Sequence, residues 1–541
     1  MTIQAKVATP AAAQSEKLLS KVAGWIDRRS AWMLPLWIAA YFVVLWEPAH
    51  RPLWYDELFT YYVATSPTLE RFIGCIRFVD LNPPLSYLFV RLSIATFGDS
   101  PFVTRLPSIL SFLVASLVVW KMISRRMGGG MGLAALGIMW SFSLTAFAVE
   151  ARPYALLLAF FSLAVLCWLK AAEASHWTKW HAGLVAAIVA MLLTHCFSPA
   201  AVAAIGAGEL VRTAVRRRVD KRVWLALFAP MALLPLYIPL VRNAQAMVYP
   251  EAFKASAITV PKFYLGIMVP VLPAMGLMLL FWLAGRREST QQSWSNLAQP
   301  HEIAFAIAAF LSPLVTIGYC IWSGVPYWSR YGVSAALGGG LILAALFAFV
   351  TKRNSKATVT SAAVILILFC MTRAMTGSLS ENYRNTSAIY RTIRPELPFV
   401  TASGLTFLEM DHREPPGFAN RLFYLTDKDS ALRYHATIFE GFPILQKWFP
   451  IRAKVEPYEE FIHRNREFLV LATPGYPEDW LLLKLKSDGA EIRLSQDSRT
   501  GYRDHLLYEV KVRTQGSPAP DESRSARRSS DESDCPRKVI P

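Results

Sequence analysis

The sequence contains few of the features that mark metal centres, disulfide scaffolds or nucleotide-driven enzymes. Its 541 residues include only six cysteines, and their spacing matches neither a metal-ligand set nor a disulfide framework. No Walker-type phosphate loop occurs, and no G-x-G-x-x-G opens a helix after a strand, so we do not expect a nucleotide-driven pump. The N-terminus lacks a clear signal-peptide cleavage site, which predicts that the first apolar segment is a retained anchor.

Apolar sequence, by contrast, is in excess, and it comes in blocks. Hydrophobic residues make up 54% of the chain and its mean hydropathy is +0.31, which is more apolar than soluble domains are. Most blocks approach the ~20 residues that cross a bilayer core, although Trp32–Trp46 and Ala200–Val211 are shorter. The longer blocks are Leu106–Ile123, Met131–Val149, Tyr154–Leu169, Ala182–Phe197, Val223–Val241, Phe263–Ala284, Ile303–Trp322, Gly332–Val350 and Ala357–Met371. We predict an α-helical polytopic membrane protein with about eleven transmembrane helices.

The net charge of +17 does not indicate a nucleic-acid partner, because the basic residues gather in alternate loops. With a cytoplasmic N-terminus, the loops on the cytoplasmic side hold Lys121, Arg125, Arg126, Lys170, Lys179, Arg212, Arg216, Arg217, Arg218, Lys221, Arg222, Arg286, Arg287, Lys352, Arg353 and Lys356. The short outer loops hold only Arg152, Arg242, Lys254 and Arg330. This positive-inside bias predicts a multi-pass inner-membrane protein and fixes its orientation.

Composition divides the chain into four parts. Residues 1–30 are polar and form a predicted cytoplasmic tail, and residues 31–376 hold all the spans, with a long first extracytoplasmic loop at 47–105. Residues 377–513 have no long apolar run, and the parity of the spans places them outside. Residues 514–541 are rich in serine, proline and charge, which predicts a disordered tail.

The apolar segment Pro84–Phe97 decides the topology of everything after it. It is short and contains Arg91, and a crossing here would reverse the side of every later loop. We therefore interpret it as an amphipathic helix that lies on the outer membrane surface. A tilted span is the alternative.

Alternating apolar and charged segments predict a small extracytoplasmic α/β domain in residues 377–513. Strands are expected at Pro398–Ser403, Leu422–Leu425, Phe468–Ala472 and Leu506–Val512, and helices at Pro457–Arg466 and Asp479–Lys486.

Two acidic motifs lie in the first outer loop. Asp56 and Glu57 follow Tyr55 in an aromatic stretch just beyond the first span, and a second motif begins at Asp80 and includes Asn82. A carboxylate at the membrane surface can act as a general base toward an incoming hydroxyl or amine. Asp80 and Asn82 could face the same cavity as Asp56. The structural alternative is an interfacial aromatic belt with solvated acids, followed by a proline turn.

Arginines occur at two other outer helix ends. Arg152 lies between Glu150 and Tyr154, and Arg330 precedes Tyr331. A guanidinium suits two-pronged contacts to phosphate oxygens, so both arginines are candidate phosphate ligands. The structural alternative for Arg152 is an ion pair with Glu150 at a helix–helix turn. Because all these motifs fall on one face of the predicted membrane domain, they suit a reaction between a membrane-held phosphosugar and an outside acceptor.

Two further ionisable residues lie in or near apolar blocks. An ionisable side chain in such a position suggests a function, and His195 and Glu209 are both of this kind. Neither has an identifiable partner in the sequence, so we interpret both as packing or interfacial residues.

Taken together, these motifs resemble the C-type glycosyltransferase superfamily, and within it the branch of protein O-mannosyltransferases and lipid A aminoarabinose transferases. The resemblance covers residues 30–350 and rests on the Asp56–Glu57 pair, on Asp80-Leu-Asn-Pro-Pro-Leu85, on Phe97-Gly98 with Arg105-Leu-Pro-Ser108, on Glu150-Ala-Arg-Pro-Tyr154 and on Arg330-Tyr331. A trailing extracytoplasmic α/β domain is similar to that of some bacterial members.

The resemblance implies a sugar donor on polyprenyl phosphate, an inverting transfer and a catalytic aspartate in the first outer loop. Carried over, this aspartate is Asp56, with Glu57 beside it, and Asp80 matches the acid of the second motif. Arg330 and Tyr331 match the region that holds the lipid phosphate. Asn82 departs from the histidine of the mannosyltransferases and from the lysine of the aminoarabinose branch, and Arg152 stands where the latter has aspartate.

The expected function is therefore transfer of a sugar from a polyprenyl-phosphate donor to a lipid, glycan or protein acceptor outside the bilayer. Asp56 is expected to act as the base, and Arg152 and Arg330 to bind the phosphate. The residues expected to line the cavity are Tyr55, Asn82, Glu150 and Tyr154.

Several questions stay open at the level of the sequence. No cofactor is assigned; a divalent metal beside the carboxylates remains an option, although no ligand set is evident. A transporter or flippase for lipid-linked sugars is the alternative function, and it would need no extracytoplasmic base. A non-catalytic scaffold whose outer domain binds a partner is a third interpretation.

Overall fold

The fold is that of a computed structural model, and its described residues are 28–246, 254–284, 297–351, 360–367, 387–434, 442–472, 480–495 and 505–512, with a few single positions besides. The predicted disordered tail at 514–541 and most of the predicted cytoplasmic tail at 1–30 lie outside the described residues. Only part of the apolar block Ala357–Met371 is described, and residues 360–367 of it are helical.

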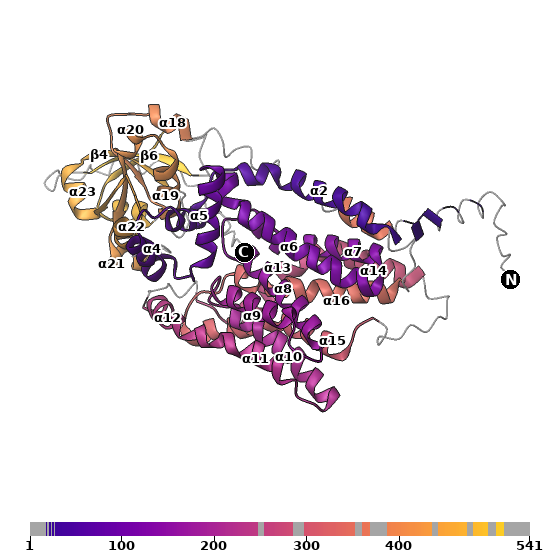
Figure 1. The fold of residues 1–541 in the computed structure, drawn as a ribbon. Helices are drawn as coiled ribbons and strands as arrows, with labels where there is room; N and C mark the ends of the chain where they lie inside the picture. Colours follow the sequence, from indigo (N-terminus) through magenta and orange to yellow (C-terminus); the bar gives the residue numbers. More distant parts are fainter. Residues whose placement is uncertain are drawn as a thin grey trace.

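The predicted apolar blocks fold as helices that pack into one bundle (Figure 1). The uninterrupted ones are α2 (Ser30–His50), α6 (Pro101–Met127), α7 (Gly129–Ser141), α8 (Tyr154–Ala172), α9 (Lys179–Leu192), α10 (Ser198–Arg216), α15 (Pro300–Ser323) and α16 (Ser334–Val350). Two segments change helix type along their length: α11 (Lys221–Phe228), η3 (Ala229–Tyr237) and α12 (Ile238–Gln245) form one, and α13 (Thr259–Met268), η5 (Val269–Val271) and α14 (Leu272–Ala284) form the other.

The described residues contain fewer helices of membrane-spanning length than the eleven spans predicted. Among the described residues, six helices are long and apolar enough to cross a membrane, or seven if α7 and the following 3-10 helix η2 (Ser143–Val149) form one span bent by 84°. The count of eleven is therefore not confirmed. One physical reason is length, because the apolar helices α9 and α16 each have fewer than the ~20 residues that a perpendicular crossing needs.

Local sequence sets both ends of α6, which contributes many side chains to the hydrophobic core of the bundle. Ser100 caps α6 by accepting a hydrogen bond from the amide of Val103 at 3.3 Å, and Pro101 occupies its first position, where its missing N–H costs nothing. Gly128 ends the helix with φ of +93°, a conformation that a residue with a side chain rarely adopts. Small residues then let helices approach closely: a Cβ added at Gly338 of α16 would lie 2.4 Å from the amide nitrogen of Phe310 in α15.

The first loop is helical over most of its length. It comprises α3 (Tyr55–Ala64), α4 (Leu69–Cys75), the π-helix η1 (Ile76–Asp80) and α5 (Leu85–Phe97). The predicted amphipathic segment is thus a helix, and α5 buries Tyr87 and Val90 while it exposes Leu88 and Leu92.

The C-terminal part is a six-stranded sheet with helices on both faces, and it lies at one end of the bundle (Figure 1). Its strands are β1 (Phe399–Thr401), β2 (Leu422–Thr426), β3 (Lys454–Pro457), β4 (Glu467–Ala472), β5 (Glu491–Leu494) and β6 (Leu506–Lys511). The order is β3-β2-β1-β4-β6-β5, parallel from β3 to β4 and antiparallel at β6 and β5. Its helices are α18 (Ser387–Thr392), α19 (Gly404–Arg413), α20 (Pro416–Ala419), α21 (Lys428–Arg433), α22 (Phe442–Trp448), α23 (Tyr458–Arg464) and α24 (Trp480–Ser487).

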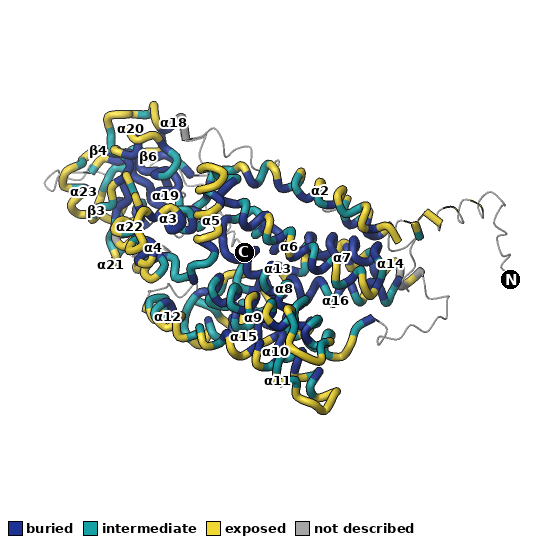
Figure 2. The backbone as a smooth tube through the Cα atoms, in the orientation of Figure 1, coloured by how far each residue is buried: buried dark blue, intermediate teal, exposed yellow. Residues whose placement is uncertain are grey.

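The predicted α/β fold of this part is confirmed, with all four expected strands and both expected helices in place. The sequence did not predict β3 and β5. These two outermost strands are only half-buried or exposed, so they lack the apolar runs that revealed the others, whereas β4 is buried along almost its whole length (Figure 2).

The sheet domain and the first loop share one hydrophobic core. Leu58, Tyr62 and Phe72 of the loop pack in the same buried cluster as Phe407 and Leu469 of the sheet domain. The packing is close, because a Cβ added at Gly74 would lie 2.1 Å from the ring of Trp448. The loop that carries the acidic motifs is therefore held between the helical bundle and the sheet.

Candidate active site

Glu57 is the most deeply buried carboxylate of the first loop. It caps the start of α3, where its Oε2 accepts the amide of Trp54 at 3.2 Å, and its Oε1 accepts the amide of Ala151 at 2.8 Å. Arg105 of α6 donates to both oxygens, at 2.7 and 2.5 Å, and the glutamate side chain is 0% exposed. Each carboxylate oxygen thus already accepts two hydrogen bonds, and none is open to a substrate.

Arg105 extends this anchor to the end of the first span. Its guanidinium also donates to the carbonyls of Ala49, Arg51 and Pro52, at 3.0, 2.5 and 3.1 Å. One buried arginine therefore ties the end of α2 and the start of α3 to α6. The sequence showed Arg105 only as part of a motif; an isolated arginine at the start of an apolar helix was the signal of a buried partner.

Asp56 lies beside Glu57 but projects in a different direction. Neighbouring residues on a helix point about 100° apart, and this rotation brings the carboxylate of Asp56 to Arg330. The two form an ion pair in which both side chains keep some contact with solvent, at 15% and 19% exposure. Arg330 belongs to the short helix η8 (Ser329–Gly332), just beyond the end of α15, and also lies over the ring of Trp328.

Arg152 is paired with Asp80, and no ion pair with Glu150 is seen in the described part of the chain. Its two terminal nitrogens donate to the two carboxylate oxygens of Asp80, both at 2.9 Å. Tyr87 donates a further hydrogen bond to the same carboxylate at 2.6 Å. Arg152 also reaches the carbonyl of Asp56 at 3.0 Å, so it holds the start of α3 in place.

Glu150 lies next to these ion pairs but forms no ion pair itself among the described residues. Its Oε2 is buried and has no hydrogen-bond partner among the described residues. Burial, together with the negative charges of Glu57 and Asp56, raises the pKa of Glu150 to about 8. This carboxyl is therefore largely protonated near neutral pH, unlike a solvated glutamate.

Aromatic side chains cover one side of the two arginines. The rings of Tyr154 and Tyr331 lie 5.4 and 5.7 Å from that of His195, and Phe197 is 4.9 Å from Tyr331. His195 is buried, with its Nδ1 accepting the amide of Phe197 at 3.1 Å, and its Nε2 has no partner among the described residues. The predicted Tyr154 and Tyr331 thus belong to one aromatic group, to which the structure adds His195 and Phe197.

The two remaining predicted cavity residues, Asn82 and Tyr55, make structural contacts. The Asn82 amide donates to the carbonyl of Asp80 at 3.0 Å and fixes the turn that follows η1. Tyr55 is buried in the core shared with the sheet domain, and its amide donates to Glu409 at 3.0 Å. Both residues position the acidic motifs.

Glu209, for which no partner could be identified in the sequence, is fully paired. Its carboxylate accepts two hydrogen bonds from Arg212, both at 2.8 Å, and one from the indole of Trp168 at 2.9 Å. The structure thus supplies the partners that could not be identified in the sequence. A glutamate and an arginine three residues apart on a helix are neighbours, which was the signal in the sequence. No group of three or more His, Cys, Asp or Glu side chains suited to a metal ion occurs among the residues that the structure describes.

This chain is similar to one protein family over part of its length and to one solved protein over most of it. The family model described as dolichyl-phosphate-mannose-protein mannosyltransferase matches residues 81–241. The structure is similar to the crystal structure of ArnT from Cupriavidus metallidurans bound to undecaprenyl phosphate, with a TM-score of 0.54 and 14% sequence identity over 90% of this chain and 98% of that chain. The apo form of the same protein gives a TM-score of 0.56 with the same identity and coverage. The chain has the fold of the predicted glycosyltransferase branch. No curated protein is a significant match in sequence.

The family match covers a much smaller part of the chain than the fold match does. The fold match spans 90% of the chain. The family match is confined to 81–241 and contains Arg105, Glu150 and Arg152, while Asp56 and Arg330 lie outside it. The assignment of these last two residues therefore rests on their geometry.

Proposed function

We propose that this protein transfers a sugar from a polyprenyl-phosphate donor to an acceptor outside the cytoplasm, with inversion at the sugar. The acceptor is a lipid, glycan or protein that offers a hydroxyl or amine. The observation that carries the proposal is the ion pair between Asp56 and Arg330. It joins the residues that we propose as general base and as phosphate ligand, and both side chains keep some exposure to solvent.

In the proposed reaction, the acceptor oxygen or nitrogen attacks the anomeric carbon of the donor. The bond from that carbon to the phosphate oxygen breaks, and polyprenyl phosphate leaves with the electron pair. Asp56 takes the proton of the acceptor. Arg330 binds the phosphate and stabilises the charge that grows on its oxygen in the transition state.

The contact between Asp56 and Arg330 gives the donor a way to prepare the base. A phosphate that binds Arg330 competes with Asp56 for the same guanidinium. Binding of the donor would therefore free the carboxylate to accept a hydrogen bond from the acceptor. This exchange would delay activation of the base until the donor is present, which limits loss of the donor to water.

The other predicted site residues receive supporting roles. Both terminal nitrogens of Arg152 are taken by Asp80, so we assign phosphate binding to Arg330 and a positioning role to the Arg152–Asp80 pair. Glu57 is likewise assigned to positioning, because both of its oxygens are saturated.

An apolar groove supports a lipid-linked donor. A cavity of about 190 Å³ adjoins the second acidic motif and is lined by Ile73, Ile76, Leu193, Leu236 and Leu240, among others. Apart from Arg77, this lining is apolar or aromatic, which suits an isoprenoid chain. ArnT was crystallised with undecaprenyl phosphate, which agrees with a donor of this class.

Mass spectrometry of surface glycans and lipids from a deletion strain tests the proposal. We expect one envelope component to lose a single sugar, and the matching polyprenyl-phosphate sugar to accumulate. The transporter alternative predicts instead that the donor accumulates while membranes still catalyse transfer when the donor is added from outside. An unchanged envelope and unchanged lipid pool would contradict the proposal.

The orientation is part of the proposal. Basic residues concentrate in the loops after α6, α8 and α10, which favours a cytoplasmic side there and an extracytoplasmic site and sheet domain. Reporter fusions at Arg217 and Ser380 should report the inside and the outside, respectively. Both reporters on one side would overturn this topology.

A further inference from the structure

A large cleft lies at the end of the bundle opposite the Asp56–Arg330 pair. It has a volume of about 840 Å³ and is bordered by α6, α8, α10, α15 and α16. Three of these helices, α6, α8 and α10, have their last residues at the cleft, and α15 begins there. Arg330 follows the far end of α15, whose 24 residues span about 36 Å. The cleft therefore cannot contribute to the same reaction centre.

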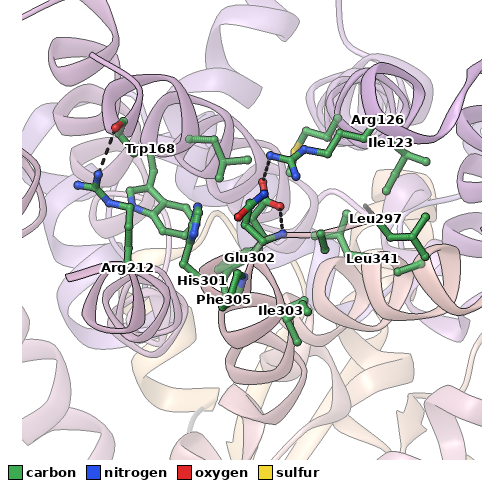
Figure 3. A pocket seen from close by; sticks show the side chains of 18 of the residues that line it. Ile123, Arg126, Trp168, Arg212, Leu297, His301, Glu302, Ile303, Phe305 and Leu341 are labelled. Atoms are coloured by element: carbon green, nitrogen blue, oxygen red, sulfur yellow. Dashed lines mark hydrogen bonds and ion pairs between the residues drawn. The ribbon is translucent and has the colours of Figure 1, made fainter. Parts of the chain in front are cut away.

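The walls of the cleft are apolar and continue onto the outer surface of the bundle. Leu297, Phe305 and Leu341 line its interior (Figure 3). Ile303, Ile307 and Leu346 also line it, and each is more than a third exposed. In a bundle of apolar helices such residues face the bilayer, so the cleft opens sideways to lipid.

The rim of the cleft is basic. Arg126 is engaged by Glu302 at 2.7 Å, as Figure 3 shows, and Lys170 by Glu173 at 2.5 Å. Arg125 and Arg216, by contrast, are exposed and form no ion pair within the described part of the chain. They come from different helices, α6 and α10, and both border the same cleft. An apolar cleft with two uncompensated arginines at its polar end has the charge and shape of a lipid-phosphate site.

We propose that this cleft binds an anionic phospholipid, with its acyl chain against Ile303, Ile307 and Leu346 and its phosphate at the end of the cleft that Arg125 and Arg216 line. Basic pockets between membrane helices recognise such headgroups on the cytoplasmic side, and this end carries the loops that the charge pattern assigns to the cytoplasm. The site is independent of the proposed transfer reaction.

A phospholipid fits the cleft better than the polyprenyl-phosphate donor does. A donor bound here would hold its sugar a bundle length away from Asp56. Arg125 and Arg216 are two single charges on different helices, which suits the phosphodiester headgroup of a phospholipid. Such a headgroup, unlike the donor, needs no pocket for a sugar. Binding of the lipid would fill the space between α6, α10 and α15 and stabilise the bundle by mass action.

Native mass spectrometry of the full-length protein with added lipid tests the proposal. Phosphatidylglycerol should bind more tightly than phosphatidylcholine, and the cleft variants should leave binding of undecaprenyl phosphate unchanged. Each arginine near a lipid phosphate contributes a factor on the order of five in affinity, so Arg125→Gln/Arg216→Gln should weaken phosphatidylglycerol binding about thirtyfold. Arg218→Gln is the matched control, because Arg218 is an exposed arginine of the same loop that does not line the cleft.

A second variant tests the cleft itself. Ala345 of α16 lines it, and Ala345→Trp should fill the space and weaken phosphatidylglycerol binding with both arginines intact. An equal loss in Arg218→Gln, equal binding of phosphatidylcholine, an equal loss of undecaprenyl phosphate binding in Arg125→Gln/Arg216→Gln, or unchanged phosphatidylglycerol binding in Ala345→Trp would each overturn the proposal. Melting temperatures without lipid separate these results from misfolding.

Discussion

Asp56 and Glu57 are neighbours in the sequence, yet they occupy opposite kinds of environment. Glu57 is fully buried, saturated with hydrogen bonds and fixed by Arg105, whereas Asp56 keeps 15% exposure of its side chain and a single ion pair, with Arg330. The pair of acids that looked like one motif is therefore an anchor and a candidate base. The lesson is that the accessible side of a helix, and not the motif, decides which acid can react.

The two ion pairs also differ in what holds them. Burying an ion pair costs a large desolvation free energy, which is offset only when further hydrogen bonds satisfy the charged groups. Arg105 has such hydrogen bonds, because it donates to backbone carbonyls as well as to Glu57. The pair of Asp56 with Arg330 has fewer constraints, because Arg330 Nε has no hydrogen-bond partner among the described residues. Such a pair can exchange one partner for a phosphate at lower cost.

The largest expected effect comes from Asp56→Asn, which keeps the size of the side chain and removes its charge. Loss of a general base typically slows a reaction by ~10²–10⁴-fold. Transfer should fall by this factor, while the melting temperature stays near that of the wild type. Asp99→Asn is the control, since Asp99 is an exposed acid of the same loop that accepts a hydrogen bond from Tyr61. Full activity in Asp56→Asn would remove Asp56 from the mechanism.

Glu57→Gln should have the opposite profile. It leaves Arg105 buried without a counter-charge, and breaking a buried pair in this way costs about 3–5 kcal/mol. We expect a large drop in melting temperature and in the amount of folded protein, with near-normal activity for each molecule that folds. A variant with wild-type stability would show that Glu57 is no anchor.

Arg330→Ala should weaken binding of undecaprenyl phosphate by roughly ten- to a hundredfold, because a hydrogen bond to a charged group contributes ~1.5–3 kcal/mol. Arg330→Lys should restore only part of the affinity, since lysine lacks the two-pronged geometry. Arg242→Ala, at an exposed position, serves as the control. Equal lipid affinity in wild type and Arg330→Ala would exclude Arg330 as the phosphate ligand.

The Arg152–Asp80 pair should show coupling in stability. We expect Arg152→Gln and Asp80→Asn each to lower the melting temperature, and the double variant to lose less than the sum, with a coupling of about 0.5–3 kcal/mol. Lipid affinity should change little in Arg152→Gln. A selective loss of lipid affinity with unchanged melting temperature would return Arg152 to the phosphate site, as the sequence first suggested.

The smallest expected effect concerns the pH dependence of stability. The pKa of Glu150 is about 8 in the folded protein against an ordinary value of 4.5, so between these values the folded state holds a proton that the unfolded state has lost. Stability from this group therefore falls as the pH rises through that window. Glu150→Gln should flatten the fall in melting temperature between pH 5 and 8, whereas Glu70→Gln, at an exposed position, should not. Parallel curves for wild type and Glu150→Gln would contradict the assignment.

The sequence predicted the sheet domain well, because β1, β2, β4 and β6 carry apolar runs that end at polar segments. It predicted less of the membrane part. A hydropathy pattern identifies apolar blocks, but it does not show where the helix within a block is interrupted, as it is between α7 and η2. Nor does hydropathy distinguish a short apolar helix from a helix that spans the membrane.

The sequence placed the charged motifs on one face but did not predict their pairing. Asp56 meets Arg330 across 274 residues, and Arg152 meets Asp80 across 72. The local alternative, Glu150 with Arg152, was the only pair that spacing along the chain suggested. Helix packing, and the core that the first loop shares with the sheet domain, determine which charged side chains form pairs. Neither can be predicted from a single sequence motif.

The rate of sugar transfer per folded molecule, compared between Asp56→Asn and Glu57→Gln, tests the account most directly. Membranes from a deletion strain that expresses each variant provide the assay, with the missing envelope component as the product and folded protein quantified in parallel. The account predicts a rate per folded molecule that falls by ~10²–10⁴-fold in Asp56→Asn and stays close to wild type in Glu57→Gln. Equal losses in the two variants, or a greater loss in Glu57→Gln, would contradict it.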